Sequence, residues 1–274
     1  MTLWVDGRLV DDESSPVLRA DDHGITVGDG VFETMKVVDG RPFAISRHLE
    51  RLTVSAAGLG IPLDLAQVRA GIDAVLAADP AGRARLRVTV TGGPSPYGSD
   101  RGQATPTLVI ATAPLTDWPP TTDVVTVPWT RNERAATAGM KTTSYADNVV
   151  ALRHAHDRGA AEAIFANTRG ELCEGTGTNV FVGVAGRLLT PPLDSGCLAG
   201  VTRALLVEWL GDVGEERMPL SALADAEEAF LASSTRDVQP IRAVDGRQLP
   251  ACPGPLTRRA AEVFASRSQA EADP

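Results

Sequence analysis

The chain has 274 residues, of which 43% are hydrophobic and 22% are charged, and its formal net charge at pH 7 is -9. This length suffices for one large domain or two modest ones, each with its own core. The composition is typical of a soluble globular protein, and the negative charge argues against a general nucleic-acid surface, which needs a basic patch. No apolar stretch has membrane-spanning length, and the N-terminus lacks the pattern of a signal peptide. We therefore expect a cytoplasmic protein that binds neither nucleic acid nor membrane.

The cysteines and histidines give no sign of a metal site. Cys173, Cys197 and Cys252 are odd in number and lack the spacing of zinc ligands, and the four histidines do not cluster with them. We expect reduced thiols and no bound metal.

The first part of the chain alternates turn signals with regular patterns. Asp-Gly pairs at 6–7 and 39–40 lie between strand-like runs and predict two β-hairpins. Apolar residues then recur every three or four positions after Ser46, which is the predicted N-cap of a helix. A second helix is expected around 65–78. Strict alternation of apolar and polar residues predicts a strand with one buried face over 84–91.

A stretch rich in proline and threonine divides the chain. It predicts an interdomain linker at 118–123, between a small N-terminal domain of residues 1–117 and a larger C-terminal domain of residues 124–274.

The C-terminal part alternates strands and helices. A helix is expected to end near Gly159, and a later strand carries Glu174. The corner at 200–202 opens another helix, Ser221 is the predicted cap of a further one, and the tail from Pro255 is expected to be helical.

The chain has only two lysines, Lys36 and Lys141, and the rest of its basic charge is arginine. Arginine can replace lysine wherever only a cation is needed, but its guanidinium stays protonated and cannot form an imine with a carbonyl. A lysine kept in so arginine-rich a chain is therefore a candidate nucleophile, although most lysines simply lie at the surface. Lys36 continues a strand-like run with no motif around it, so Lys141 is the candidate.

Six short motifs, in order along almost the whole chain, carry a family resemblance. They are GlyAspGlyValPheGluThr (28–34), HisLeuGluArgLeu (48–52), GlyMetLys (139–141), GluGlyThrGlyThrAsnValPhe (174–181), LeuAlaGlyValThrArg (198–203) and SerSerThr (233–235). Each alone is weak. Together they resemble the class IV aminotransferase family, the fold-type IV group of pyridoxal-phosphate enzymes. That family includes D-amino-acid and branched-chain aminotransferases, (R)-amine transaminases and aminodeoxychorismate lyases.

The resemblance implies a fold and an assembly. The expected fold is α/β (α+β), with a small N-terminal α/β domain, a larger C-terminal domain of β-barrel-like character and the cofactor between them. Family members are homodimers, so we expect a homodimer that acts on small molecules, an amino donor and a 2-oxo acid acceptor.

Two residues carry the chemistry that the resemblance implies. Lys141 would form an aldimine with the aldehyde of pyridoxal 5'-phosphate and then move a proton between the substrate carbon and the cofactor carbon, which requires a partly neutral amine. Glu174 would lie against the pyridine nitrogen and keep it protonated, so that the ring withdraws electrons.

The resemblance also implies a set of groups for the cofactor phosphate. Arg51 matches the family's phosphate arginine, and a guanidinium binds phosphate oxygens in a bidentate way. The amides of Val201 and Thr202 open a helix, whose N-terminus attracts anions. Ser234 and Thr235 would add donors from the next loop.

The loop that grips the substrate carboxylate departs from the family pattern. Typical D-amino-acid aminotransferases carry an arginine and a histidine where this chain has Tyr97 and Ser99. Arg101, Arg131 or Arg134 could substitute, although each could equally be a plain loop arginine.

Two activities follow from the resemblance. The first is a transaminase that moves an amino group from a D-amino acid or an (R)-amine to a 2-oxo acid in ping-pong half-reactions. The alternative is a 4-amino-4-deoxychorismate lyase that releases p-aminobenzoate and pyruvate, favoured by the missing trap and by Phe32, where many members have tyrosine. A branched-chain enzyme is a more distant third. A non-catalytic binding protein would not need both Lys141 and Glu174.

Overall fold

The computed structural model describes residues 1–10, 15, 17–79 and 82–274, which fall into two compact units. The first unit comprises Met1–Thr116, Met140–Tyr145 and Ala272–Pro274, and the second comprises Asp117–Gly139 and Ala146–Glu271. The chain therefore passes between the units four times. Neither unit is one continuous stretch of sequence.

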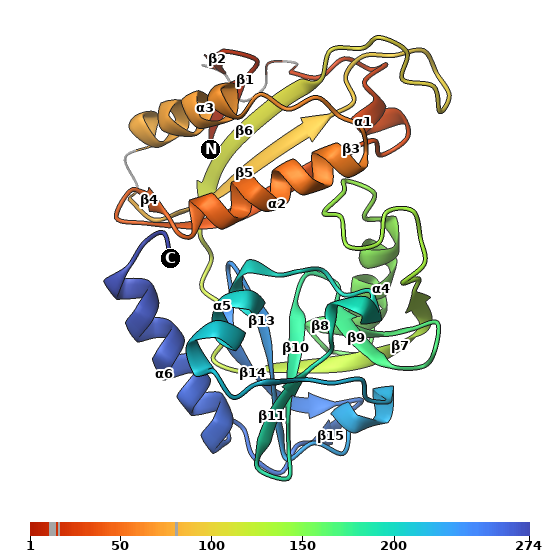
Figure 1. Ribbon diagram of the computed structural model, residues 1–274, viewed down its shortest axis with the longest axis vertical. Helices are drawn as coiled ribbons and strands as arrows, with labels where there is room; N and C mark the ends of the chain where they lie inside the picture. Colours follow the sequence, from red (N-terminus) through yellow and green to blue (C-terminus); the bar gives the residue numbers. More distant parts are fainter. Residues whose placement is uncertain (11–14, 16, 80–81) are drawn as a thin grey trace. The chain divides into compact units, whose positions relative to one another are not determined.

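The first unit is built on an antiparallel sheet. In the described residues its six strands are β1 (Thr2–Val5), β2 (Arg8–Val10), β3 (Gly30–Val38), β4 (Arg41–Pro42), β5 (Ala84–Thr91) and β6 (Thr107–Pro114). They lie in the order β2-β1-β6-β5-β3-β4 (Figure 1).

Both predicted hairpins are confirmed. The turn residues Asp6 and Asp39 have φ values of 43° and 50°, and Gly7 and Gly40, which follow them, have φ values of 99° and 71°. Two successive residues with positive φ give the tight turn whose twist matches that of the flanking strands.

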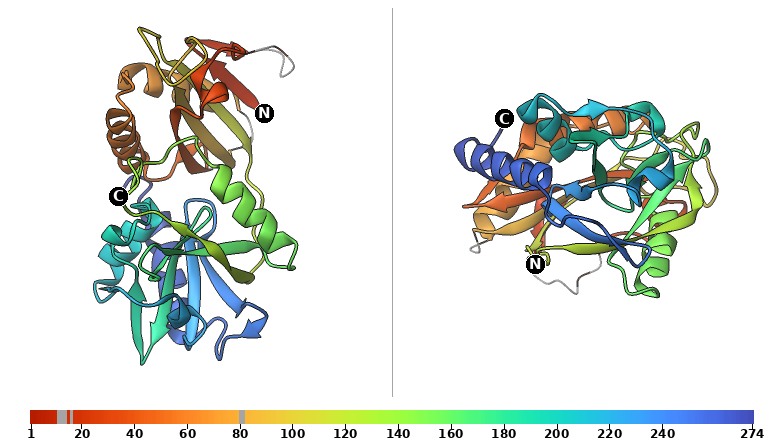
Figure 2. Two further views of the ribbon diagram at one scale, coloured as in Figure 1. Left: turned by 90° about the vertical axis from the view of Figure 1, so that its right-hand side faces the viewer. Right: turned by 90° about the horizontal axis from the view of Figure 1, so that it is seen from below.

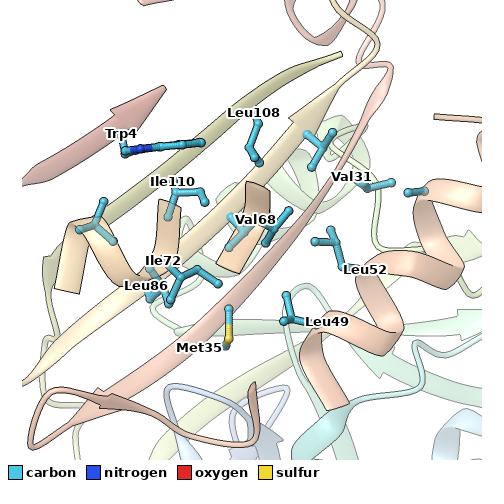
Figure 3. Packing of buried hydrophobic residues seen from close by; sticks show 14 of the residues in the cluster. Trp4, Val31, Met35, Leu49, Leu52, Val68, Ile72, Leu86, Leu108 and Ile110 are labelled. Atoms are coloured by element: carbon cyan, nitrogen blue, oxygen red, sulfur yellow. The ribbon is translucent and has the colours of Figure 1, made fainter. Parts of the chain in front are cut away.

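Helices cover one face of this sheet. They are α2 (Ile45–Gly58) and α3 (Leu65–Ala78), while the short α1 (His23–Thr26) precedes β3 (Figures 1 and 2). Leu52 of α2, Ile72 of α3 and Leu86 of β5 are fully buried in one core cluster (Figure 3). The predicted alternation of β5 is confirmed, because Leu86 and Val88 face this core whereas Arg87 between them is exposed.

The predicted N-cap of α2 is wrong. The helix begins at Ile45, after Ala44 in the left-handed conformation with φ 53° and no side-chain cap. Ser46 is itself capped, because the carboxylate of Asp273 accepts hydrogen bonds from the Ser46 amide at 2.8 Å and from its hydroxyl at 2.6 Å. Local sequence could not show a cap that lies 227 residues away.

The second unit holds a larger mixed sheet. Its nine strands in the described residues are β7 (Thr122–Arg131), β8 (Glu162–Asn167), β9 (Leu172–Gly175), β10 (Asn179–Val184), β11 (Arg187–Thr190), β12 (Gly214–Glu215), β13 (Glu228–Ser233), β14 (Asp237–Val244) and β15 (Arg247–Gln248).

These strands follow the path β12-β11-β10-β13-β14-β7-β8-β9, with β15 paired to β14. β7 runs parallel to both β14 and β8. β9 at one end of the path also contacts β10, so the sheet curls into a half-barrel (Figures 1 and 2). The expected barrel-like character of this part is confirmed.

Helices α4 (Ala146–His156), α5 (Val201–Leu210) and α6 (Pro255–Ala270) belong to the second unit. α5 and α6 start where the sequence predicts. α4 ends three residues before Gly159. Ser221 lies inside a short 3-10 helix, η2 (Leu220–Leu223), whose N-cap is Pro219, so the helix predicted to begin at Ser221 is wrong. A second 3-10 helix is η1 (Leu193–Ser195).

The described helices include none long and apolar enough to cross a membrane, and the described His, Cys, Asp and Glu side chains form no cluster that could hold a metal ion. All three cysteines are free thiols. Burial raises the pKa of Cys173 and raises that of Cys197 to about 11, so both stay protonated at neutral pH.

The cap supplied by Asp273 should protect the first turn of α2. Asp273→Ala removes two hydrogen bonds, and loss of a helix cap costs about 1 kcal/mol, or about a fivefold change in the opening equilibrium. Amide hydrogen exchange at Ser46 should therefore accelerate about fivefold. Glu271→Ala, which removes a carboxylate two residues away, should leave that rate unchanged; an unchanged rate in Asp273→Ala would contradict the assignment.

Candidate active site

Lys141 is fixed by backbone pairing to β3. The amide of Phe32 donates to the Lys141 carbonyl at 3.0 Å, and the amide of Thr143 donates to the Gly30 carbonyl at 2.8 Å. The Lys141 amide in turn donates to the Ser55 hydroxyl of α2 at 3.1 Å. The lysine segment is thus a short addition to the sheet of the first unit, which leaves the Lys141 backbone little freedom.

The Lys141 side chain lies against aromatic rings. Its Nζ is 4.4 Å from the centroid of the Phe32 ring and donates a hydrogen bond to the Tyr145 hydroxyl at 3.2 Å. The two rings contact edge to face, with centroids 5.1 Å apart. The structure therefore brings together two of the predicted residues, Lys141 and Phe32, and adds Tyr145. No motif pointed to Tyr145, although it lies one helical turn's length after Lys141 in the sequence.

Arg51 belongs to a buried charged cluster in the first unit. Its Nε and one terminal nitrogen each donate to the Glu33 carboxylate at 2.7 Å. His48, the fourth residue of α2, contacts the same carboxylate through Nδ1 at 2.7 Å. The paired hydrogen bonds hold the guanidinium plane in one orientation. The sequence indicates Arg51 as a phosphate ligand but gives no sign that Glu33 orients it.

The charges in this cluster are strongly coupled. Burial alone raises the pKa of the Glu33 carboxyl, but the Arg51 guanidinium and the His48 imidazole outweigh it and lower the pKa to about 2. Burial lowers the pKa of His48, which favours the neutral imidazole. Neutral His48 can then donate its Nδ1 hydrogen to the Glu33 carboxylate.

Glu174 lies at the end of β9 in the second unit and is largely buried. Its Oε1 is 3.0 Å from Nε of Arg131, and its Oε2 accepts a hydrogen bond from the Leu198 amide at 2.9 Å. Arg131 also donates to Asn148 of α4 at 2.9 Å, and its guanidinium lies 4.3 Å from the centroid of the Phe165 ring. Arg131 is thus a partner of Glu174, which the sequence did not indicate.

The loop whose Leu198 amide donates to Glu174 leads directly into α5. The Leu198 carbonyl accepts a hydrogen bond from Asn179 at 2.9 Å, two residues before Gly200. A Cβ atom on Gly200 would lie 1.9 Å from the Asn179 side-chain oxygen, so any larger residue there would force the Asn179 side chain to move. Val201 and Thr202 follow as the first, buried residues of the helix.

The start of α5 has the character of an anion site. Gly200 at the N-cap offers no side chain, so no cap accepts hydrogen bonds from the first amides. Those amides have no partner within the helix and lie at the positive end of its dipole. Ser234 and Thr235 form the turn that joins β13 to β14, and α5 packs against β13. These groups fit a phosphate. The hydrogen bond from the Leu198 amide links the segment that precedes α5 to Glu174.

A second buried carboxylate, which sequence analysis missed, supports the loop after Glu174. Glu162 accepts hydrogen bonds from the amide and the hydroxyl of Thr176, and from the Thr178 hydroxyl at 3.3 Å. Arg236, next to the 234–235 turn, donates to the same carboxylate at 3.2 Å. A glutamate inside the apolar run of β8 was the available signal, because a buried carboxylate needs partners.

The other residues predicted to bind the substrate contact solvent or parts of the chain other than Lys141. Tyr97 is 78% exposed. Arg101 donates to both carboxylate oxygens of Asp29, at 2.8 and 2.6 Å, and to the carbonyls of Leu59 and Gly60. The Arg101 guanidinium therefore ties the 97–101 loop to neighbouring elements. The side chain of Arg134 is 78% exposed.

The fold is that of a class of enzyme that uses pyridoxal phosphate. Residues 30–244 match the family described as amino-transferase class IV, and the chain belongs to this family. The family uses pyridoxal phosphate. The expected fold type IV is confirmed by the solved structures of aminotransferases that resemble the chain.

Three proteins show how close these similarities are. The chain is 32% identical to the bifunctional aminodeoxychorismate lyase / D-amino acid transaminase of Mycobacterium tuberculosis, over 97% of this chain and 96% of that protein. A hypothetical aminotransferase of M. tuberculosis in its PLP-bound form is 29% identical, with a TM-score of 0.86 over 97% of this chain and 98% of that one. The branched-chain aminotransferase of Thermoproteus uzoniensis with norvaline is 28% identical, with a TM-score of 0.87 over 97% and 93%.

The pair of Glu33 and Arg51 should contribute strongly to stability. Glu33→Gln leaves a buried guanidinium without its counter-charge, so the free energy of unfolding at pH 7 should fall by about 3 kcal/mol, measured by urea denaturation. Glu50→Gln, on the exposed side of α2, should change it by less than about 0.5 kcal/mol.

The stability difference between wild type and Glu33→Gln should depend on pH. Because folding lowers the pKa of Glu33 from 4.5 to about 2, its contribution is complete above pH 4.5 and is lost as the pH falls toward 2. The stability gap between wild type and Glu33→Gln should hold between pH 7 and pH 5 and then narrow. A gap that stays constant below pH 4.5 would refute the assigned ion pair.

Proposed function

We propose that this protein is a pyridoxal-phosphate-dependent transaminase that moves an amino group from a D-amino acid or an (R)-amine to a 2-oxo acid. The observation that carries the proposal is the placement of Lys141, which is fixed by pairing to β3, with its amine against Phe32 and Tyr145. Two further observations support the proposal. The chain belongs to the class IV aminotransferase family, and the name of its 32% identical M. tuberculosis relative includes D-amino acid transaminase.

Pyridoxal phosphate, when bound, supplies an aldehyde that reacts with amines and a ring that withdraws electrons from the reacting carbon. Lys141 Nζ would hold the aldehyde, and as a free amine it would take a proton from the substrate carbon and return one. The Tyr145 hydroxyl orients this nitrogen, and the Phe32 ring shields it from water.

Glu174 is assigned to the pyridine nitrogen. A carboxylate there keeps the nitrogen protonated and so preserves the electron demand of the ring. Arg131, 3.0 Å from Glu174, stabilises the ionised carboxylate, and the Leu198 amide fixes its orientation.

The phosphate is assigned to two sets of donors. The first unit contributes Arg51, oriented by Glu33. The second contributes the amides of Val201 and Thr202 at the uncapped start of α5, together with Ser234 and Thr235 of the turn after β13. The first set supplies positive charge and the second supplies N–H and O–H donors, and both kinds of group bind phosphate.

A 4-amino-4-deoxychorismate lyase is the second candidate. Phe32 places no hydroxyl beside Lys141, and Tyr97 is exposed rather than turned toward a substrate carboxylate. The M. tuberculosis relative carries both activities in its name, so the two need not exclude each other. We further propose that the enzyme works as a homodimer, as the family resemblance implies.

A half-reaction distinguishes the two activities. Cofactor-loaded protein is mixed with D-alanine, (R)-1-phenylethylamine or aminodeoxychorismate while its visible absorbance is followed. For the transaminase, we expect an amine to bleach the visible band and convert the bound cofactor to its amino form. For the lyase, we expect p-aminobenzoate and pyruvate to appear while the band returns after each turnover.

The lysine assignment has a matched control in the same chain. Lys141→Ala should abolish the visible band and lower the rate by about 10²- to 10⁴-fold, because both imine chemistry and proton transfer lose their base. Lys36→Ala should retain the band and the rate. A Lys141→Ala protein that stays yellow and active would overturn the proposal.

Gly200 tests the phosphate assignment. Because a Cβ atom there collides with Asn179, Gly200→Ala should displace the start of α5 and weaken pyridoxal phosphate binding by about tenfold, which is about 1.4 kcal/mol. Titration of the apoprotein by fluorescence measures this affinity. The double variant Gly200→Ala/Asn179→Ala removes the collision and should recover part of it; wild-type affinity in Gly200→Ala would exclude the assignment.

A further inference from the structure

The arginines that the sequence offered for the substrate carboxylate are engaged elsewhere. All three nitrogens of the Arg101 guanidinium donate to Asp29 or to backbone carbonyls. Arg131 is shared between Glu174 and Asn148. Arg134 is largely in solvent, 3.8 Å from its sequence neighbour Glu133. A cation close to Lys141 must therefore come from another part of the chain.

Arg87 is such a cation. It lies on β5 directly opposite Thr34 of β3, and the next register pair on the same face is Phe32 and Thr89, two positions along the strands. Leu86 and Val88, on either side of Arg87, face the core beneath α2 and α3. Because successive side chains of a strand point to opposite faces, Arg87 projects from the face that the helices leave uncovered, which is the face that carries Phe32.

The Arg87 guanidinium packs on the Phe32 ring. Its Cζ lies 3.8 Å from the ring centroid, and its Nε donates a hydrogen bond to the Thr89 hydroxyl at 3.1 Å. A guanidinium stacked on a ring keeps its terminal N–H groups at the edge, where they can bind an anion. Phe32 and Thr89 thus orient the cation without neutralising it.

No carboxylate balances this charge in the part of the chain that the structure describes. The groups that act on Arg87 electrostatically are Tyr145 and the cation Arg85. Partial burial lowers the pKa of the guanidinium, which shows that its surroundings cost it solvation. Its side chain is nevertheless exposed enough for a ligand to reach. A partly buried cation with no counter-charge is suited to bind an anion.

Arg87 and Lys141 share the same ring. Arg87 Cζ and Lys141 Nζ lie 3.8 and 4.4 Å from the centroid of Phe32, so the two atoms are at most 8.2 Å apart. In an α-amino acid a single carbon joins the amino nitrogen to the carboxylate. With a hydrogen bond of about 3 Å to the guanidinium, such a molecule spans this separation.

We propose that Arg87 binds the carboxylate of the amino-acid substrate while Lys141 acts at its amino-bearing carbon. This inference rests on the transaminase function proposed above and names the substrate feature that the site selects, a carboxylate on the carbon that carries the amine. Phe32 holds Arg87 in place and Thr89 fixes its Nε. The strand replaces the loop residues that the family pattern led us to expect at Tyr97 and Ser99.

The test compares two donors that differ in one group. D-Alanine and 2-aminopropane are alike except that a methyl group replaces the carboxylate. In Arg87→Gln, kcat/KM for D-alanine should fall about 10- to 100-fold, mostly through KM, as expected for loss of hydrogen bonds to a charged group. The value for 2-aminopropane should change less than about twofold. Arg85→Gln, on the same strand and face, should leave both values unchanged.

A binding measurement makes the test independent of turnover. Propionate has the carboxylate but no amine, and calorimetric titration of the cofactor-loaded protein should show about tenfold weaker binding in Arg87→Gln than in wild type or Arg85→Gln. All three proteins should keep the visible cofactor band.

The outcomes separate the two proposals. A selective loss for D-alanine, together with weaker propionate binding, supports the role of Arg87. Equal losses for both donors, or no loss for either, would overturn it even if the wild type transaminates. If the wild type transfers no amino group at all, the proposed function fails, and propionate binding still decides whether Arg87 is a carboxylate site.

Discussion

The antiparallel pairing of residues 141–143 with residues 30–32 is the contact on which the lysine half of the site depends. It joins the Lys141 carbonyl to the Phe32 amide, and so places the amine beside the Phe32 ring. Glu33, the next residue of β3, points to the opposite face and holds Arg51 of α2. Because side chains alternate along a strand, one stretch of β3 orients the Lys141 amine on one side and the Arg51 guanidinium on the other.

Each unit contains a buried carboxylate that orients neighbouring side chains and backbone. In the first unit Glu33 fixes the orientation of Arg51, and in the second Glu162 holds Thr176 and Arg236, so that the loop after Glu174 and the turn after β13 share one anchor. Each carboxylate is nearly inaccessible to water and is balanced by a guanidinium. A carboxylate can be buried this completely only where hydrogen bonds and an opposite charge offset its loss of hydration. Replacing any partner should therefore destabilise these networks.

Features set by local sequence were predictable, and those set by distant contacts were not. The two Asp-Gly turns, α3 and the alternation of β5 follow from neighbouring residues, and the motifs singled out Lys141 and Glu174. The start of α2 was misplaced because its cap, Asp273, lies 227 residues away. Arg101 looked available for a substrate because its partner, Asp29, is 72 residues distant. Arg87 looked like one polar residue of an alternating strand until the fold set it against Phe32.

The discontinuous first unit has a consequence for the order in which the chain folds during synthesis. Its sheet and two covering helices are complete by Thr116, yet the segment that carries Lys141 emerges only after the first strand of the second unit, and Asp273 emerges only after Glu271, where the second unit ends. A nascent chain can thus bury the Leu52 and Ile72 core early while α2 still lacks its cap and β3 still lacks the lysine segment. Cutting the gene at the linker would yield two polypeptides, neither of which contains one whole unit.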